Sequence, residues 1–210
     1  MATQLKQMTG EEFVIKVLEG ETSYRGVTFE PGFNLSGHEG YSGLLTYLIG
    51  HNHRIDSFDL SGARWKRVNA DGLYLPFANC EGADLRESSL RGANLAGADL
   101  PRANLRGVDL RRAYLWGVDF RGAHLSGAHL SGASLPRANL RGVDLRGVDF
   151  DGVQLLEADL SGADLRGVKN LDSAVNLGYA LFLETKVTQT EKAIIEGTKA
   201  LKDRELFVVE

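Results

Sequence analysis

A five-residue repeat runs through the middle of the chain, from Phe58 to about Leu165, without an insertion or a deletion. Every fifth residue from Leu60 to Leu165 defines a series of 22 centres, of which 17 are Leu and two are Phe. Two residues before each centre stands Ala 13 times and Val six times. Two consecutive units show the frame: Ala93-Asn94-Leu95-Ala96-Gly97 and Ala98-Asp99-Leu100-Pro101-Arg102.

A period of five fits neither the 3.6-residue period of a helix nor the two-residue period of a strand. Apolar residues two apart point to the same side of an extended segment. The last position of the unit is Gly in 15 of the 22 units, and Gly is favoured where the chain turns with positive φ. Each unit is therefore predicted to form a short extended side and a corner. Fixed short periods of this kind are typical of β-solenoids, whose units bury their apolar faces by stacking.

The repeated unit closely resembles the A(D/N)LXX pattern of the pentapeptide-repeat family. The resemblance implies an all-β solenoid, a right-handed quadrilateral β-helix with about four units per coil and short helical caps at the N- and C-termini. The 22 units then make about five and a half coils. At ~4.8 Å between paired strands the rod is on the order of 26 Å long before the ends are added.

Three segments are predicted along the chain. Residues 1–23 form an N-terminal cap whose first eight residues are expected to be disordered. A helix is predicted over 10–19, because Thr9 and Glu12 make a capping box ahead of an apolar run. The β-helix is predicted over 24–171, with an insertion at about 38–56 that replaces about one coil and forms a short helix on the rod. Residues 172–210 form a C-terminal cap, with a helix at about 189–202 and a final strand over 205–210.

The corners that begin with proline lead to a separate prediction. Pro76, Pro101 and Pro136 stand at the first corner position, where Pro presets φ. The residues that follow are not glycine, although a type II turn favours Gly at this place. A turn without positive φ is therefore expected at these three residues, Phe77, Arg102 and Arg137.

Residues 20 apart are predicted to stack in columns, one coil above another. One side concentrates apolar and aromatic residues, and its candidate partner surface consists of Tyr74, Phe77, Tyr114, Trp116 and Leu156. An exposed cluster of this kind marks a contact surface. Two readings are open: the insertion or the C-terminal helix covers this side, which is the favoured reading, or the side is free for a partner.

Two further columns carry charge. A candidate basic ladder consists of Lys66, Arg86, Arg106, Arg146 and Arg166. Carboxylates neighbour most of these residues, so a solvated and self-neutralising face is favoured over binding of an anionic partner. A second column is suited to a basic partner but is interrupted by Arg121 and Arg141; it reads Asp59, Asn79, Asp99, Asp119, Asn139 and Asp159.

The composition narrows the functional classes. The net charge is −4, and the repeats from 57 to 171 carry 15 basic and 14 acidic residues, so no direct nucleic-acid binding is expected. One cysteine, Cys80, fits a reducing compartment and an inert core position. No apolar run reaches membrane-spanning length, and a cytoplasmic protein without a membrane partner is expected. Neither catalytic nor cofactor-binding nor metal-binding residues are predicted, since the residues show no phosphate loop, catalytic triad or metal-ligand spacing.

These observations favour a non-catalytic protein–protein interaction or scaffold protein that presents patterned faces of a rigid β-helix to an unknown protein. The alternative follows from the resemblance, because some family members imitate duplex DNA and regulate or protect the type II topoisomerase gyrase as dimers joined through C-terminal segments. A homodimer through the C-terminal segment is open here as well. The near-neutral repeats speak against DNA imitation, because a mimic of duplex DNA is expected to be acidic along its length.

Overall fold

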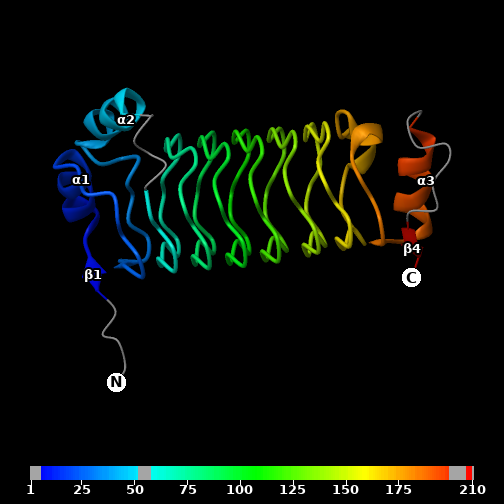
Figure 1. The fold of residues 1–210 in the computed structure, drawn as a ribbon, viewed down its shortest axis with the longest axis horizontal. Helices are drawn as coiled ribbons and strands as arrows, with labels where there is room; N and C mark the ends of the chain where they lie inside the picture. Colours follow the sequence, from blue (N-terminus) through cyan, green and yellow to red (C-terminus); the bar gives the residue numbers. More distant parts are fainter. Residues whose placement is uncertain (1–5, 52–57, 199–206, 210) are drawn as a thin grey trace, which may run out of the picture.

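The chain winds into a right-handed quadrilateral β-helix with helices at both ends (Figure 1). The computed structural model describes residues 6–51, 58–198 and 207–209. Parallel bridges join residues 20 apart in neighbouring coils, as from Asp59 to Asn79 and from Asn79 to Asp99. Each side of the coil is thus one narrow parallel ladder, and four ladders enclose the core. The fold predicted from the repeat is confirmed.

The core is the column of centres together with the small residues that precede them. All 22 centres are buried, and so are the residues two positions before them. Ser88 is the polar member of this set, and its hydroxyl accepts a hydrogen bond from the Val68 amide at 3.1 Å. Trp65 stands beside Ala70 in the first regular coil, where a large and a small side chain share the volume.

The prediction that three corners avoid positive φ is wrong. Phe77, Arg102 and Arg137 have φ of 60°, 58° and 57°, close to the 62–73° of the glycines at the other corners. The reason is the ladder: the Arg102 amide donates to the Arg121 carbonyl oxygen of the next coil at 2.9 Å. Stacked coils thus impose one turn on every corner, and the residue type does not change it.

The N-terminal end is closed by two strands and two helices, β1 (Gln7–Met8), α1 (Gly10–Leu18), β2 (Thr28–Phe29) and α2 (Tyr41–Gly50). Because β1 pairs in parallel with β2, residues 7–8 are ordered, contrary to the prediction. The predicted helix over 10–19 is confirmed as α1, with its Thr9–Glu12 capping box. The Phe13 ring of α1 closes the open end of the first coil, and its centroid lies 4.8 Å from that of the Tyr24 ring.

The insertion takes the place of at most one side of the first coil, not of a whole coil as predicted. Ser23, Thr28 and Asn34 supply three sides of that coil, since they bridge to Asp59, Arg64 and Asn69. The sequence position of the fourth side, between 34 and 59, holds α2 and residues 52–57, which lie outside the described residues. The Tyr41 hydroxyl donates to the Asp71 carbonyl oxygen at 2.6 Å, and α2 contacts α1. The insertion therefore belongs to the N-terminal cap (Figure 1).

The coil continues past the predicted boundary at 171. Val175, Leu181 and Lys186 bridge to Gln154, Asp159 and Asp164, at spacings wider than 20 because the last coil contains short 3₁₀ turns, η2 (Leu171–Ser173) and η3 (Leu177–Tyr179). The strand β3 (Thr185–Val187) follows, and α3 (Gln189–Gly197) closes the end. A last strand, β4 (Phe207–Val209), pairs with β3. The predicted helix end at 202 and part of the predicted strand lie outside the described residues.

Candidate functional site

One side of the rod has no charged residue in the two rows that face outward from it, although the next corner row, to which Phe77 belongs, carries Arg137 and Glu157. We call it the aromatic side and define it by two rows. The bridging residues of the side are Tyr74, Asn94, Tyr114, Ser134, Gln154 and Val175. In successive coils, the first corner position that follows this side holds Pro76, Ala96, Trp116, Pro136 and Leu156. Each of the other three sides carries both carboxylates and basic residues.

The aromatic side is open to solvent along most of its length. Tyr114 is 60% exposed and Trp116 is 48% exposed. Phe77 and Leu156 are exposed as well, whereas Tyr74 is half-buried against the core. The helices α2 and α3 lie at the two ends of the rod (Figure 1), so the favoured reading, in which one of them covers this side, is wrong.

The apolar surface continues around the last coil. Tyr179, Leu181 and Leu183 are exposed, and they follow Val175 around the corner onto the neighbouring side. Sequence reasoning missed these residues because η2 and η3 add residues to the last coil and shift the 20-residue register. Tyr179, Leu181 and Leu183 are two residues apart, a spacing that indicates one shared face. Which side of the coil they lie on can be assigned only once the extra residues of η2 and η3 are placed.

The basic ladder is largely neutralised by aspartates on its own side. Arg86, Arg146 and Arg166 each donate Nε–H to an oxygen of the aspartate two residues earlier, at 2.7–2.8 Å. These hydrogen bonds hold the pKa of Asp84, Asp144 and Asp164 below its ordinary value. Lys66 lies 3.8 Å from Glu87. For Arg106, the backbone amide contacts the Asn104 side chain at 3.5 Å.

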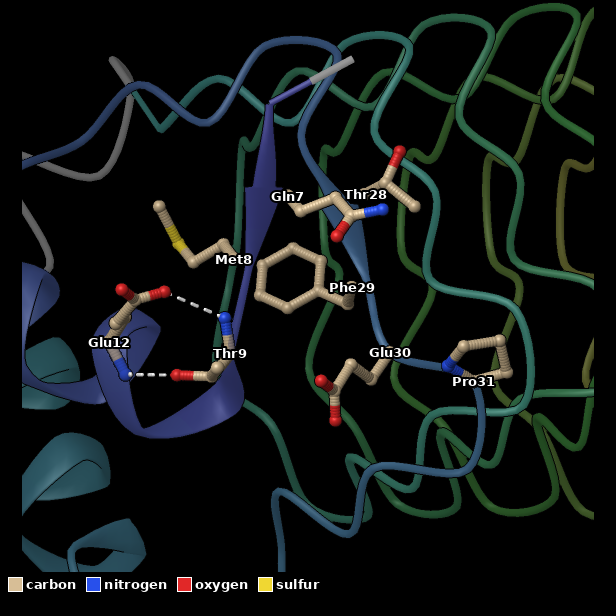
Figure 2. A pocket seen from close by; sticks show the side chains of 8 residues that line it. All are labelled: Gln7, Met8, Thr9, Glu12, Thr28, Phe29, Glu30 and Pro31. Carbon is tan, nitrogen blue, oxygen red and sulfur yellow. Dashed lines mark hydrogen bonds between the residues drawn. The ribbon is translucent and has the colours of Figure 1, made fainter.

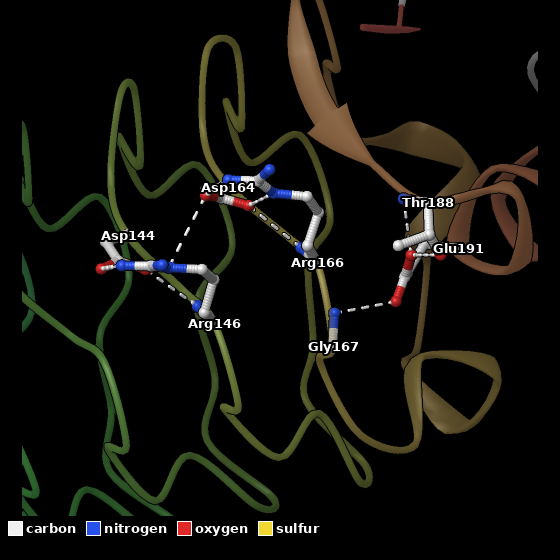
Figure 3. A network of polar contacts seen from close by, with 7 residues as sticks. All are labelled: Asp144, Arg146, Asp164, Arg166, Gly167, Thr188 and Glu191. Atoms are coloured by element: carbon white, nitrogen blue, oxygen red, sulfur yellow. Dashed lines mark hydrogen bonds and ion pairs between the residues drawn. The ribbon is translucent and has the colours of Figure 1, made fainter. Parts of the chain in front are cut away.

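The polar network of this side extends to the C-terminal helix (Figure 3). Arg146 also reaches Asp164, at 3.7 Å. Beyond the last arginine, the Gly167 amide donates to Glu191 Oε1 at 3.0 Å, and the Thr188 amide donates to Glu191 Oε2 at 2.7 Å. Burial raises the pKa of Glu191, but the hydrogen bonds from Thr188 and Gly167 outweigh it and lower the pKa overall. Glu191 therefore joins α3 to the last regular corner.

The column of aspartates and asparagines is interrupted as expected. Arg121 pairs with Asp119 at 2.6 Å and Arg141 pairs with Asp159 at 3.0 Å. Arg102 also pairs with Glu81 across this side. The carboxylates here are thus balanced by arginines, and the column is not a continuous acidic surface.

Other places that commonly host chemistry have structural roles here. A groove of about 290 Å³ beside β1 and β2 (Figure 2) contains Thr9 and Glu12, but these two residues bond to each other in the capping box. Burial raises the pKa of the Cys80 thiol to about 12. The described residues contain no cluster of three or more side chains of the metal-ligating types. Among them no helix is long and apolar enough to cross a membrane.

Comparisons with known proteins agree with this architecture. The sequence model described as "Pentapeptide repeats (8 copies)" matches residues 59–92, 78–117, 88–127 and 135–169. A comparison with curated protein sequences found no match.

Solved structures with the same repeats are similar to this chain. Rfr23, a pentapeptide repeat protein from the cyanobacterium Cyanothece 51142, is 21% identical; the match covers 64% of this chain and 98% of that one, with a TM-score of 0.46. The pentapeptide repeat protein alr5209 from Nostoc PCC 7120 is 32% identical over 46% of this chain and 83% of its own, with a TM-score of 0.40. QnrB1, a plasmid-mediated fluoroquinolone resistance protein, is 19% identical over 89% and 81%, with a TM-score of 0.36.

Proposed function

This chain belongs to the pentapeptide-repeat family, and from that premise we propose that it is a non-catalytic protein–protein interaction protein whose contact surface is the aromatic side. One observation carries the proposal: the side without charge is also the side on which Tyr114 and Trp116 stand exposed. Large exposed apolar surfaces on soluble domains mark contact sites. The proposal includes a cytoplasmic location, in keeping with the single buried cysteine.

The composition of this side resembles that of a protein interface. Binding energy in interfaces concentrates in Trp, Tyr and Arg near the centre of the contact. Arg112, Tyr114 and Trp116 belong to one coil, midway along the regular aromatic side. No carboxylate among the described residues pairs with Arg112, which leaves its guanidinium available to a partner. The corners on both flanks carry charges such as Arg91 and Glu157, and this arrangement matches an apolar centre within a polar rim.

The gyrase alternative lacks a supporting observation. DNA imitation needs a negative field along the rod, whereas each charged side has aspartates that are paired with arginines, as Asp109 is with Arg111 at 2.8 Å. The alternative is tested by measuring gyrase supercoiling with and without this protein. The second assay measures whether the protein relieves the inhibition of gyrase by a quinolone. We expect no change in either assay.

The interaction proposal is tested by affinity capture with matched double variants. Tyr114→Glu with Trp116→Glu places two carboxylates on the aromatic side. His124→Glu with Ser126→Glu places them in the same positions of the unit on another side. Partners are expected to be lost from the first variant and retained by the second. Circular dichroism is expected to show that both variants are folded. Equal retention by both variants would contradict the proposal.

A further inference from the structure

We propose that the aromatic side binds the aromatic side of a second copy of this chain, in an antiparallel pair related by a twofold axis. This inference rests on the proposed function, because it names the occupant of the same surface. The shape and the flanking charges of the surface carry it.

The aromatic side alternates between large and small residues from coil to coil. Large side chains occur in the coils of Phe77, of Tyr114 with Trp116, and of Leu156. The coils between them carry Asn94 with Ala96, and Ser134 with Pro136. Because neighbouring coils are ~4.8 Å apart, ridges recur about every 10 Å along the rod, with a shallow groove between each pair of ridges.

A second copy is the partner whose ridges have this same spacing. When two aromatic sides meet with the rods parallel and in step, ridge meets ridge. When one rod is reversed, ridges can face grooves across the four middle coils of the contact. A twofold axis that lies between the coils of Tyr114 and Ser134 places Tyr114 and Trp116 against Ser134 and Pro136 of the second copy. The same axis places Leu156 against Ala96, so the four middle coils are self-complementary. At the two ends the coil of Tyr74 and Phe77 meets that of Val175, which is also exposed.

The charges along one flank favour this register over the one with its axis between Asn94 and Tyr114. The first corner row before the aromatic side reads Asp71, Arg91, Arg111, Ser131 and Asp151. In the proposed register Arg91 faces Asp151 of the second copy. Moving the axis by one coil, to lie between Asn94 and Tyr114, brings Arg91 against Arg111 instead, and like charges oppose the contact. The Arg91 side chain is 51% exposed and lies 4.0 Å from its own nearest carboxylate, that of Asp109, while Asp151 is exposed.

The absence of charge on the aromatic side also favours a copy of itself. A partner with charged groups in its contact surface would lose their hydration without finding a counter-charge here. The side measures roughly 24 Å by 10 Å, from six coils and a three-residue extended segment. This is about 240 Å² per copy, well below the roughly 600 Å² per partner of the smallest specific complexes, so the pair is expected to be weak, to exchange with the monomer and to depend on protein concentration.

Sedimentation velocity over a concentration series tests the pair with charge variants of the full chain. Arg91→Asp alone and Asp151→Arg alone are each expected to weaken association by at least five-fold, because each places like charges opposite one another. The double variant, Arg91→Asp with Asp151→Arg, is expected to restore association to within two-fold of the original protein. A double variant as weak as either single variant would overturn the register.

Cross-linking between copies tests the antiparallel contact independently. The proposed axis sets Asn94 opposite Gln154 of the second copy, so a mixture of Asn94→Cys and Gln154→Cys chains is expected to form a disulfide dimer upon oxidation. A mixture of Asn104→Cys and Asp164→Cys chains, with the substitutions at equivalent positions on another side, serves as the control and is expected to stay monomeric. Equal cross-linking of both mixtures, or of neither, would overturn the proposal.

Failure of this inference is distinguishable from failure of the proposed function. If the protein stays monomeric at all concentrations but the Tyr114→Glu, Trp116→Glu variant still loses its partners in affinity capture, the occupant is another protein and the inference alone falls. If the protein stays monomeric and that variant retains the same partners, both fall.

Discussion

At the scale of single residues, the corners show how stacking overrides backbone preference. Seven of the 22 corners between 62 and 167 hold a residue other than Gly with positive φ, among them Arg112 at 58°. A residue with a side chain costs about 1–2 kcal/mol in this region relative to Gly. The ladder hydrogen bonds of adjacent coils offset this cost, as at Arg102. The repeat therefore tolerates arginine and glutamate at corners, where they add charge to the surface.

Two substitutions, one that adds a side chain at a corner and one that removes it, test the free-energy cost of a side chain at positive φ. Gly127 has φ of 70° and open space around an added Cβ, so Gly127→Ala is expected to destabilise the protein by about 1 kcal/mol through the backbone alone. Arg112→Gly is expected to stabilise it, since Gly adopts positive φ freely. Denaturant unfolding measures both changes. Two shifts of the same sign would contradict this explanation of the corners.

At the scale of elements, each end of the coil is closed by a helix that begins with a capping box and is held on the rod by one of its side chains. In α1 the Phe13 ring enters the coil, at 5.4 Å from the Trp65 ring centroid. In α3 the carboxylate of Glu191 serves both the Thr188 amide and the Gly167 amide. The exposed ladder edges of a solenoid need covering of this kind.

Replacing Glu191 tests the attachment of α3. Glu191→Ala leaves two backbone amides without their acceptor and is expected to cost about 2 kcal/mol, with faster amide hydrogen exchange in α3 (Gln189–Gly197). Glu196→Ala, on the same helix, removes an exposed carboxylate 3.7 Å from Lys192 and is expected to leave exchange unchanged. Similar exchange in both variants would show that Glu191 does not hold the helix.

The sequence predicted what depends on the repeat and failed where the repeat changes. The buried centres and the aromatic column from Tyr74 to Leu156 follow from the five-residue frame alone. The corner at Phe77 was mispredicted, because local turn preference was weighed without the ladder. Leu181 was missed, because extra residues in η2 and η3 shift the frame. The position of α2 depends on tertiary contacts such as that of Tyr41 with Asp71, which no local pattern specifies.

At the scale of the whole molecule, three charged sides and one uncharged side surround a rigid apolar core. The charged sides are balanced by short ion pairs, such as Arg137 with Glu157 at 2.7 Å, which keep these surfaces hydrated. The uncharged side runs along the rod and joins the apolar last coil at Val175. Under the proposed function, the three charged sides stay hydrated and the fourth side recognises the partner.

Hydroxyl-radical footprinting, read residue by residue in dilute protein and in concentrated protein or with a captured partner, tests this division most directly. The account predicts strong labelling of Tyr114 and Trp116 in dilute protein and their protection in the complex, while labelling of His124 on another side stays the same. Weak labelling of Trp116 in dilute protein, or equal labelling in both states, would contradict it.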